Sequence, residues 1–382
     1  MPARANKLKK VLFCEAGHHG GSVKRLLTFL GSIDEIQILP VLLTFYRDGK
    51  AGRFFELPGT FPRESMGVEY DPIPDTIRMA WKIPMPTIFA ARYFWRSVKA
   101  LRRHRPDVVY LNNTPFCHLP MIAACRWFGV PMICHMRDTI RLTRAERWAL
   151  EGISRVVVLS EAARKHYGDQ GVPHEKMEVV YNGISLDEFD RKKLEGGDGI
   201  PAGRSVVALT GLLVPRKRQM VAIRAVQRLV DEFPDILLVL YGDGPDRGAI
   251  EDYVEKNGLT NHVKVHGWTD NVAGHLANAK IGLMVSEREG MPNVVMEYMA
   301  ASVPVVATNL SGIDEMVVEG VNGFIVEVDD VASLAGRLAA LVRDEESRQT
   351  VGRNGRAMLE SGKFTIDAEH ERIRSIILGV AQ

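Results

Sequence analysis

The fold of this chain is decided by residues 289–297, which read Glu-Gly-Met-Pro-Asn-Val-Val-Met-Glu, and by the apolar run Pro304-Val305-Val306 that follows a small-residue turn. Proline suits the first turn of a helix, because its missing N–H would have no partner there. The segment therefore predicts a loop, a helix that starts near Pro292, and then a buried strand. That order is typical of sheets covered by helices.

The same segment places two carboxylates around a helix start. A helix that begins near Pro292 points the amides of residues 293–295 outward as an anion site. Glu289 then stands on the loop before that site, and Glu297 lies one turn in, on the side of Asn293. This pattern suits a site for a sugar attached to a diphosphate.

Length and composition describe a globular protein of more than one domain. With 382 residues, 46% of them hydrophobic and 25% charged, the chain exceeds one ordinary core. No run of about 18 apolar residues predicts a membrane span. The apolar run Val11–Cys14 after the basic N-terminus is too short for a signal peptide. We expect a cytoplasmic protein whose four cysteines are buried reduced thiols: Cys14, Cys117, Cys125 and Cys134.

Charge is shared unevenly between the two halves. Residues 1–189 carry 27 Lys and Arg against 19 Asp and Glu, and the remaining residues carry 22 against 28. A basic half joined to an acidic half suggests that one lobe faces an anionic partner.

Short apolar runs alternate with helical periodicities along the whole chain, which predicts an α/β protein with parallel sheets. The strands expected in the first half are Val11–Cys14, Ile36–Leu43, Val108–Asn112, Met132–His135 and Val156–Ser160. Those expected in the second half are Val206–Gly211, Ile236–Gly242, Val263–Gly267, Ile281–Ser286, Val303–Thr308 and Gly323–Val326.

The domain boundaries follow from composition. The Gly-rich segment 191–203 has no apolar period and is interpreted as a linker. It separates an N-terminal domain over 1–190 from a C-terminal domain over 204–362. Residues 363–382 are predicted to form a C-terminal helix that packs back on the N-terminal domain. In open α/β sheets ligands bind beyond the carboxyl ends of strands, so we expect an active site in a cleft that both Rossmann-like domains share.

A set of motifs in fixed order carries a family resemblance. They are Gly211 to Lys217, Tyr241-Gly-Asp-Gly-Pro245, His266-Gly267, the Glu-x7-Glu segment, Pro304-Val-Val, Gly312-Ile-Asp-Glu315 and Asn322-Gly-Phe324. The second half thereby resembles the retaining glycosyltransferases of family 4, which have the GT-B fold. The first half matches more loosely, through Gly20-Gly21, His135-x-Arg137-Asp138, Ser160-Glu161 and Val180-Tyr-Asn-Gly-Ile184.

The resemblance assigns roles around the two glutamates. It implies that Glu289 contacts the donor sugar near the reacting carbon and that Glu297 binds the ribose hydroxyls. It also implies that Gly290 and the amides of Asn293 and Val294 hold the diphosphate. The alternatives are a solvated helix residue for Glu297 and a simple helix cap for Asn293.

Cations are expected to stabilise the leaving phosphate. Lys217 matches the family lysine that does this, near Gly211, since fixed cations stabilise a transition state that gains negative charge. The family often has an arginine just after the glycine, where this chain has Leu212, and Arg216 is a candidate replacement. The alternative is a solvated basic helix start, which the helix dipole disfavours.

Five further residues enter by the same resemblance. Gly20 and Gly21 form a turn that approaches the diphosphate and the acceptor, or are simply a tight turn. His135 lies beside the donor sugar, or is structural at its strand end. Gly242 stands in a turn near the nucleotide, and Trp268 borders the base or belongs to the core.

No Asp-x-Asp motif is present, so we expect no metal and no other cofactor besides the donor substrate.

Residues 78–105 hold eight Lys or Arg and no acid. In the expected helix there, Ile88, Ala91, Trp95, Val98 and Leu101 form a stripe assigned to the core. A neighbouring face, with Phe89, Arg92, Arg96, Lys99 and Arg103, is a candidate for reversible contact with anionic lipid headgroups. An ordinary solvated face is the alternative, and nucleic acid is disfavoured because no such motif accompanies the charge.

The resulting hypothesis is a retaining, metal-independent hexosyltransferase. It would move a sugar from a nucleotide-diphosphate sugar to a glycan or lipid-linked acceptor in cell-envelope polysaccharide or glycolipid synthesis. Such a protein would be cytoplasmic, with peripheral contact to the membrane. A nucleotide-sugar epimerase or hydrolase of the same fold, and a non-catalytic glycan-binding subunit, remain as alternatives.

Overall fold

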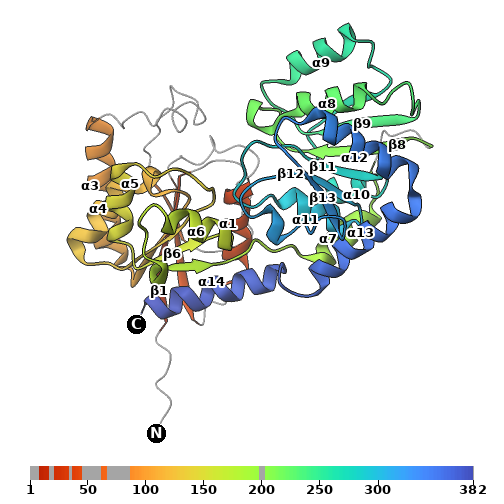
Figure 1. Ribbon diagram of the computed structural model, residues 1–382. Helices are drawn as coiled ribbons and strands as arrows, with labels where there is room; N and C mark the ends of the chain where they lie inside the picture. The colour runs from red at the N-terminus through yellow and green to blue at the C-terminus, as the bar shows by residue number, and fades with distance from the viewer. Residues whose placement is uncertain are drawn as a thin grey trace. The chain divides into compact units, whose positions relative to one another are not determined.

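The structure is a computed structural model that describes residues 8–16, 21–33, 37–44, 62–66, 87–197 and 203–381. The chain divides into two compact units (Figure 1). The first unit comprises Met1–Val180 and His370–Gln382, and the second comprises Tyr181–Glu369.

The first unit contains a seven-stranded sheet whose neighbouring strands all run parallel. Its order is β3-β2-β1-β4-β5-β6-β7, so the connection reverses direction between β1 and β4. The strands are β1 (Lys9–Glu15), β2 (Ile38–Thr44), β3 (Arg63–Ser65), β4 (Val108–Asn112), β5 (Met132–His135), β6 (Arg155–Val158) and β7 (Met177–Val179). The helices of this part of the chain are α1 (Gly21–Gly31), α3 (Thr87–His104), α4 (Leu119–Phe128), α5 (Arg144–Glu151) and α6 (Glu161–Gly168), with short 3-10 turns Pro115–His118 and His174–Lys176.

The second unit contains a six-stranded parallel sheet of order β10-β9-β8-β11-β12-β13, which reverses between β8 and β11. Its strands are β8 (Ser205–Thr210), β9 (Ile236–Tyr241), β10 (Val263–Gly267), β11 (Ile281–Met284), β12 (Val305–Thr308) and β13 (Gly323–Val326). The helices are α7 (Leu186–Leu194), α8 (Gln219–Gln227), α9 (Arg247–Lys256), α10 (Val272–Leu276), α11 (Asn293–Ala300), α12 (Val331–Arg343) and α13 (Glu345–Glu360), with 3-10 turns Pro215–Lys217 and Ile313–Glu315. Helix α14 (Ile366–Val380) ends the chain.

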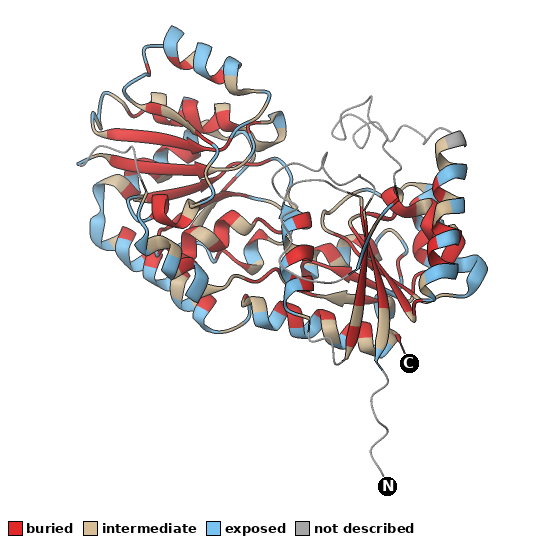
Figure 2. Cartoon of the chain, turned by 180° about the vertical axis from the view of Figure 1, so that it is seen from behind, coloured by how far each residue is buried: buried red, intermediate tan, exposed pale blue. Residues whose placement is uncertain are grey.

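Alternation along β1 shows how the first sheet is buried on both faces. Figure 2 shows that most of the strand ribbon is coloured as buried. Leu12 and Cys14 belong to the core beneath α3–α6, whereas Val11 and Phe13 belong to the core beneath α1 and α14. Successive side chains of a strand point to opposite faces, so an apolar run without polar interruptions is what a sheet covered on both sides requires.

The C-terminal helix confirms one prediction. Ile373, Ile376 and Ile377 of α14 join the core that contains Val11 and Phe13 of the first unit. The Lys9 ammonium also donates a hydrogen bond to the Ala381 carbonyl at 2.6 Å. The last residues therefore complete the first unit, although the chain reaches them only after the second unit.

The units divide earlier than the expected boundary at residue 190. The second unit begins at Tyr181. Helix α7 belongs to it, because the Arg356 guanidinium binds the Asp190 carboxylate and the Lys193 ammonium binds the Ala301 carbonyl. The expected linker over 191–203 thus starts inside a helix, and residues 198–202 lie outside the described part of the chain.

Helix α3 differs from the expected stripe. Val98 and Leu101 are buried, but Ala91 and Trp95 are exposed, and the buried surface instead runs through Tyr93 and Ser97. The assignment of Ala91 and Trp95 to the core is therefore wrong, and the side chain of Ile88 lies outside the described part of the chain. A large aromatic ring in a helical period indicates burial only when a neighbouring element covers it.

Candidate functional site

The carboxyl ends of β8 and β9 in the second unit are formed by glycines. Gly211 follows β8 and Gly242 follows β9, with φ of 154° and 152°, which side chains rarely adopt. A Cβ on Gly242 would lie 2.0 Å from the Gly211 carbonyl oxygen. The two strand ends touch through backbone alone, which leaves an edge without side chains where a ligand can approach closely.

A cluster of two cations and one carboxylate lies at this edge. The Lys217 ammonium is 2.5 Å from Glu289 Oε1, and the Arg216 guanidinium is 3.5 Å from the same oxygen. The Ser286 hydroxyl donates a third contact to it at 2.7 Å. An ideal Cβ on Gly211 would lie 3.6 Å from Lys217 Nζ, so the ammonium sits over the glycine end of β8.

The cluster brings the adjacent Arg216 and Lys217 together with Glu289, which lies 72 positions after Lys217 in the sequence. The sequence did not predict that Lys217 and Glu289 bind each other. The amide of Glu287 also donates to the Arg216 carbonyl at 2.9 Å, so backbone as well as side chains joins the two loops. The mutual contact holds both side chains in fixed places when no substrate occupies them.

The charge state of Glu289 follows from this environment. Burial opposes ionisation of the carboxyl, but the charges of Lys217 and Arg216 and the hydrogen bonds from Lys217 and Ser286 outweigh it, so its pKa is lowered. Glu289 is therefore an anion at neutral pH. An anion beside two cations leaves the cluster with net positive charge.

Helix α11 begins close to where the sequence predicts. Pro292 is its N-cap and Asn293 its first residue, so the expected start near Pro292 is correct. The amide of Val295 donates to the Pro292 carbonyl at 3.1 Å. That bond contradicts the expectation for residue 295, because the amide is used inside the first turn. The amides of Asn293 and Val294 stand at the start of the helix, and Gly290 precedes them on the loop.

Asn182 fixes the loop that enters α11. Its side-chain amide donates to the Met291 carbonyl at 3.2 Å and to Asn293 Oδ1 at 3.0 Å, and the residue is buried. A buried amide with two partners is a strong local constraint. The sequence identified Asn182 only as part of the motif Val180–Ile184. Its neighbours in the sequence give no sign of a partner more than a hundred residues away.

Glu297 lies on α11 one turn after Asn293, half-buried. Its neighbour Tyr298 anchors the helix on the sheet, because its hydroxyl donates to the Leu283 carbonyl and accepts from the Thr210 amide. A Cβ on Gly282 would lie within 2.3 Å of the Tyr298 ring, so only glycine fits there. The helix is thus held rigidly against β8 and β11.

A hollow of about 470 Å³ lies at the end of β10 in the second unit. Its lining residues are Glu195, Gly196, Gly197, His266, Trp268, Thr269, Asp270, Asn271 and His275. The rings of Tyr241, His266 and His275 pack together, with centroids between 4.5 and 5.1 Å apart. Trp268 is 58% exposed, so the alternative that it belongs to the core is wrong.

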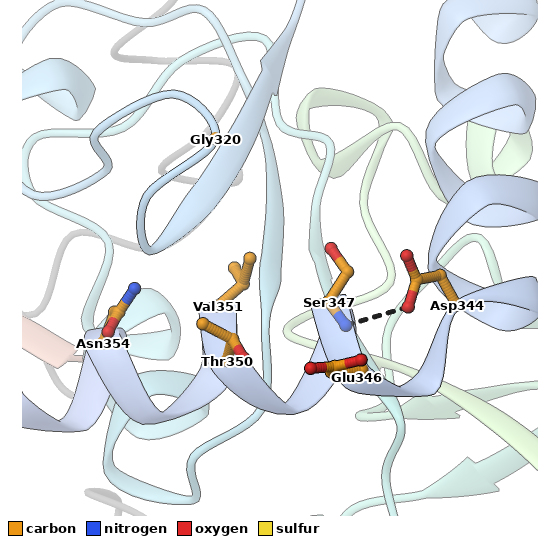
Figure 3. Close-up of a pocket in the computed structure, with 7 residues that line it drawn as sticks. All are labelled: Gly320, Asp344, Glu346, Ser347, Thr350, Val351 and Asn354. Carbon is orange, nitrogen blue, oxygen red and sulfur yellow. Dashed lines mark hydrogen bonds between the residues drawn. The ribbon is translucent and has the colours of Figure 1, made fainter.

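A second hollow of about 350 Å³ lies along the first turns of α13 and the loop at Gly320, and Figure 3 shows the residues that line it. Asp344 caps this helix by accepting from the Ser347 amide, and Glu346 lies beside it. Two carboxylates repel an anionic phosphate group, and none of the residues in the Lys217 cluster lines this hollow. It is therefore no candidate for a nucleotide.

In the first unit, His135 ends β5 and is fully buried. Its Nδ1 contacts the Tyr110 hydroxyl, and its Nε2 has no hydrogen-bond partner within the described part of the chain. Burial, followed by the charges of Arg137 and Arg25, holds its pKa well below 6.5. His135 is therefore a neutral imidazole with one nitrogen available.

Polar side chains also fill the ends of β1 and β4. The Asn112 amide donates to Glu15 Oε2 at 2.5 Å, and the Asn113 amide donates to Glu15 Oε1 at 3.0 Å. Arg137 Nε donates to Asn112 Oδ1 at 2.9 Å. Glu15 and Asn112 were not predicted as site residues. They stand at the ends of β1 and β4, between which the strand order of the sheet reverses. Ligands of open α/β sheets bind at such places, so this position could have identified them from the sequence.

Two candidate glycines fall at the border of the described residues. Gly20 lies outside them, and Gly21 is the first residue of α1. Among described residues, no group of three or more His, Cys, Asp or Glu is placed to hold a metal. The four cysteines are free and buried, as predicted. No described helix combines the length and apolar character that crossing a bilayer requires.

Comparison with known proteins agrees with this geometry. Residues 190–358 match the family described as Glycosyl transferases group 1, and residues 57–188 match Glycosyltransferase Family 4. The protein of Bacillus subtilis strain 168 that is described as "Putative glycosyltransferase EpsD" is 31% identical over 68% of this chain and 67% of its own length.

More distant relatives extend the picture. The UDP-Gal:alpha-D-GlcNAc-diphosphoundecaprenol alpha-1,3-galactosyltransferase of Escherichia coli is 24% identical over 73% of this chain and 77% of its own. The crystal structure of Anabaena Alr3699/HepE with UDP-glucose superposes with a TM-score of 0.76 at 21% identity, over 97% of this chain and 99% of that one. The fold is therefore GT-B, as predicted. Three other curated relatives are matched over about half their length, between 49% and 56%.

Proposed function

The chain belongs to the group 1, family 4 glycosyltransferases, and we propose that it transfers a sugar from a nucleotide-diphosphate sugar to a glycan or lipid-linked acceptor with retention of configuration. The observation that carries the proposal is the cluster of Lys217, Arg216 and Glu289 beside the glycine ends of β8 and β9.

The donor diphosphate would bind at this cluster. Its charge would be met by Lys217 and Arg216 and by the amides of Asn293 and Val294 at the start of α11. Lys217 lies over Gly211, where no side chain obstructs a phosphate. Phosphate binding would loosen the contact between Lys217 and Glu289, which frees the carboxylate for the sugar.

The nucleoside would occupy the hollow beside Trp268. That hollow is lined by His266 of β10 and by the loop after this strand, and Gly267 at the end of β10 pairs with Gly242. Trp268, which is 58% exposed, would stack on the base, and Glu297 on α11 would supply a carboxylate that accepts from two ribose hydroxyls. The Anabaena structure holds UDP-glucose, which makes a UDP-sugar the first donor to test.

Transfer would proceed by attack of an acceptor hydroxyl on the anomeric carbon from the face that the phosphate leaves. The carbon–oxygen bond to the diphosphate breaks as the new glycosidic bond forms, and the hydroxyl proton passes to the departing phosphate oxygen. Lys217 and Arg216 stabilise the charge that grows on that phosphate. No step requires a metal, because these cations and the helix start neutralise the diphosphate.

His135 would position a substrate in the first unit. If the Tyr110 hydroxyl donates to Nδ1, the imidazole proton resides on Nε2, which then donates to a substrate oxygen. The neutral state follows from its lowered pKa. This unit would also hold the acceptor, and an acceptor carried by a lipid would keep the protein at the inner face of the membrane.

The test is a thermal-shift panel of UDP-, GDP- and ADP-sugars with purified protein and no added metal. A shift with one donor names the nucleotide, and an acceptor screen with that donor follows. Anomeric proton couplings of the product distinguish retention from inversion. Release of nucleoside diphosphate without any acceptor would indicate a hydrolase or epimerase, and the absence of any shift from a folded sample would contradict donor binding.

A further inference from the structure

Helices α3 and α4 carry large aromatic side chains on the surface of the first unit. Trp95 of α3 is 60% exposed, and Trp127 and Phe128 at the end of α4 are 63% and 39% exposed. Single exposed apolar residues are ordinary, but contiguous ones indicate a binding surface. These three residues are called the aromatic patch below.

The patch is contiguous across the two helices. The Trp95 and Trp127 rings meet at 6.4 Å, and Trp127 stacks on Phe128 at 6.0 Å. Half-buried Phe94 lies beneath them, stacked on Trp127 at 5.8 Å with an angle of 12°. Phe94 itself packs against the sheet core. The rings are therefore held in place by the scaffold rather than scattered along a mobile surface.

Positive charge surrounds the patch on the same helix face. Arg92, Lys99 and Arg102 lie three, four and seven residues from Trp95, which places them on its side of α3, and all are exposed. The Arg102 guanidinium also lies over the Phe128 ring at 5.6 Å. Neither α3 nor α4 contains an acidic residue.

Within the described residues, Glu64 is an acid that contacts α3, and it binds the end of the helix. Glu64 lies 3.6 Å from Arg103 and 2.7 Å from His104, at the far end of α3. A third indole, Trp148 on α5, is 42% exposed and carries Arg126 over its ring at 4.6 Å. Aromatic rings interleaved with arginines thus continue from α3 through α4 to α5.

We propose that the aromatic patch and the cations around it dock the protein on an anionic lipid surface. Tryptophan favours the headgroup level of membranes, where its apolar ring is sheltered and its N–H remains hydrated. Lysine and arginine beside it attract anionic headgroups. A protein partner would leave this excess positive charge unmatched unless its own surface were acidic, whereas anionic lipid supplies both the apolar and the charged component.

The docking is reversible and superficial. The patch projects a few rings from two helices, and it has no apolar segment that could enter the hydrocarbon core. Each cation contributes about a fivefold gain in partitioning, and salt screens that gain. The inference extends the proposed function to its location, yet it does not depend on donor or acceptor chemistry.

The experiment uses the full chain with two kinds of vesicle: phosphatidylcholine alone, and phosphatidylcholine with an equal amount of phosphatidylglycerol. Flotation at low ionic strength should recover the protein with the anionic vesicles, and high salt should release most of it. W95S/W127S should bind about tenfold or more weakly. K99S/R102S should bind roughly 25-fold more weakly, at about fivefold per cation.

The matched control is K256S/R353S, which removes two exposed cations from the second unit and should bind like the unmodified protein. Circular dichroism and thermal unfolding verify that each variant folds. The proposal is overturned if the unmodified protein ignores anionic vesicles at low ionic strength, or if W95S/W127S and the unmodified protein bind equally. Light scattering that shows W95S/W127S converting a dimer into a monomer would overturn it too, since the patch would then face a second copy. No donor or acceptor is present, so a failure here leaves the proposed transfer activity untouched.

Discussion

The two parallel sheets end differently at their carboxyl edges. In the first unit the strands end in buried polar side chains, Glu15 on β1, Asn112 on β4 and His135 on β5. In the second unit β8 and β9 are followed by glycines, and the charged groups come from loops beyond the strands. The same topology has therefore been adapted in two ways.

The difference indicates what each edge can bind. The first edge is filled with groups that already hydrogen-bond to one another, so it offers a few directed contacts such as Nε2 of His135. The second edge is cleared to the backbone and carries surplus positive charge, so it can accept a diphosphate. We call the edge with Glu15, Asn112 and His135 the filled edge, and it can orient a substrate. We call the edge with Gly211 and Gly242 the cleared edge, and it can stabilise negative charge on a ligand.

The largest effect is expected from Lys217→Ala, which removes the main cation from the cleared edge. Turnover should fall by about 10²- to 10³-fold, the scale of losing one preorganised electrostatic group. Nucleoside diphosphate binding should weaken by roughly 1.5–3 kcal/mol. Steady-state kinetics and calorimetry measure the two.

Arg218→Ala is the matched control, because Arg218 binds Glu287 at 2.6 Å rather than Glu289. It should leave turnover near the unmodified level. Glu289→Gln should abolish most turnover while the protein still folds and binds the nucleotide. Unchanged activity in both Lys217→Ala and Glu289→Gln would end this model of the site.

The next effect tests whether the cleared edge needs its glycines. Gly242→Ala places a methyl group against the Gly211 carbonyl at a φ that alanine avoids. We expect the free energy of unfolding to fall by about 1–3 kcal/mol. In contrast, Gly248→Ala in α9, where a methyl meets open space, should be neutral or stabilising by about 0.5–1 kcal/mol. Denaturant unfolding compares the two, and equal stability would show that the strand ends do not touch as described.

Most of the fold was readable from the sequence, because continuous apolar runs mark strands buried on both faces. The runs at Val108–Asn112 and Met132–His135 are strands with those bounds. The two strands that were not predicted, Arg63–Ser65 and Met177–Val179, are three-residue edge strands. An edge strand is covered on fewer sides, so it needs no apolar run and leaves no signal.

The sequence predicted site residues only where a short motif contains them. Glu289, Lys217 and Arg216 were predicted from motif and resemblance, and the structure brings them together. The contact between Asn182 and Asn293 could not be predicted, because it joins distant segments and depends on tertiary placement. Trp95 shows the same limit from the other side, since a helical period does not reveal which face another element covers.

A smaller effect is expected in the filled edge, from Tyr110→Phe. Without the hydroxyl at Nδ1, the His135 proton is free to move from Nε2, and turnover should fall about 2- to 10-fold, the scale of one neutral hydrogen bond. Nitrogen-15 shifts of the imidazole should report the change of tautomer. Tyr93→Phe, at the buried pair with His118, is the control and should leave turnover and the His135 spectrum unchanged. A Tyr110→Phe variant with the unmodified spectrum would show that Tyr110 does not set the tautomer.

The smallest expected effect is a difference between the two edges in how stability depends on pH. The pKa of Glu289 is lowered from 4.5, so between 4.5 and its folded value the unfolded chain binds more protons, and the contribution of Glu289 to stability is lost as the pH falls. The stability difference between the unmodified protein and Glu289→Gln should therefore be constant above 4.5 and shrink below it.

His135 has a pKa held below 6.5, and the unfolded chain again binds more protons on acidification, but from 6.5 downward. The corresponding difference for His135→Gln should begin to shrink at that higher pH. Denaturant unfolding across this range would show two windows, one for each edge. A Glu289 difference that grew on acidification would mean that burial outweighs the two cations, and the cleared edge would then lack the surplus positive charge that suits it to a diphosphate.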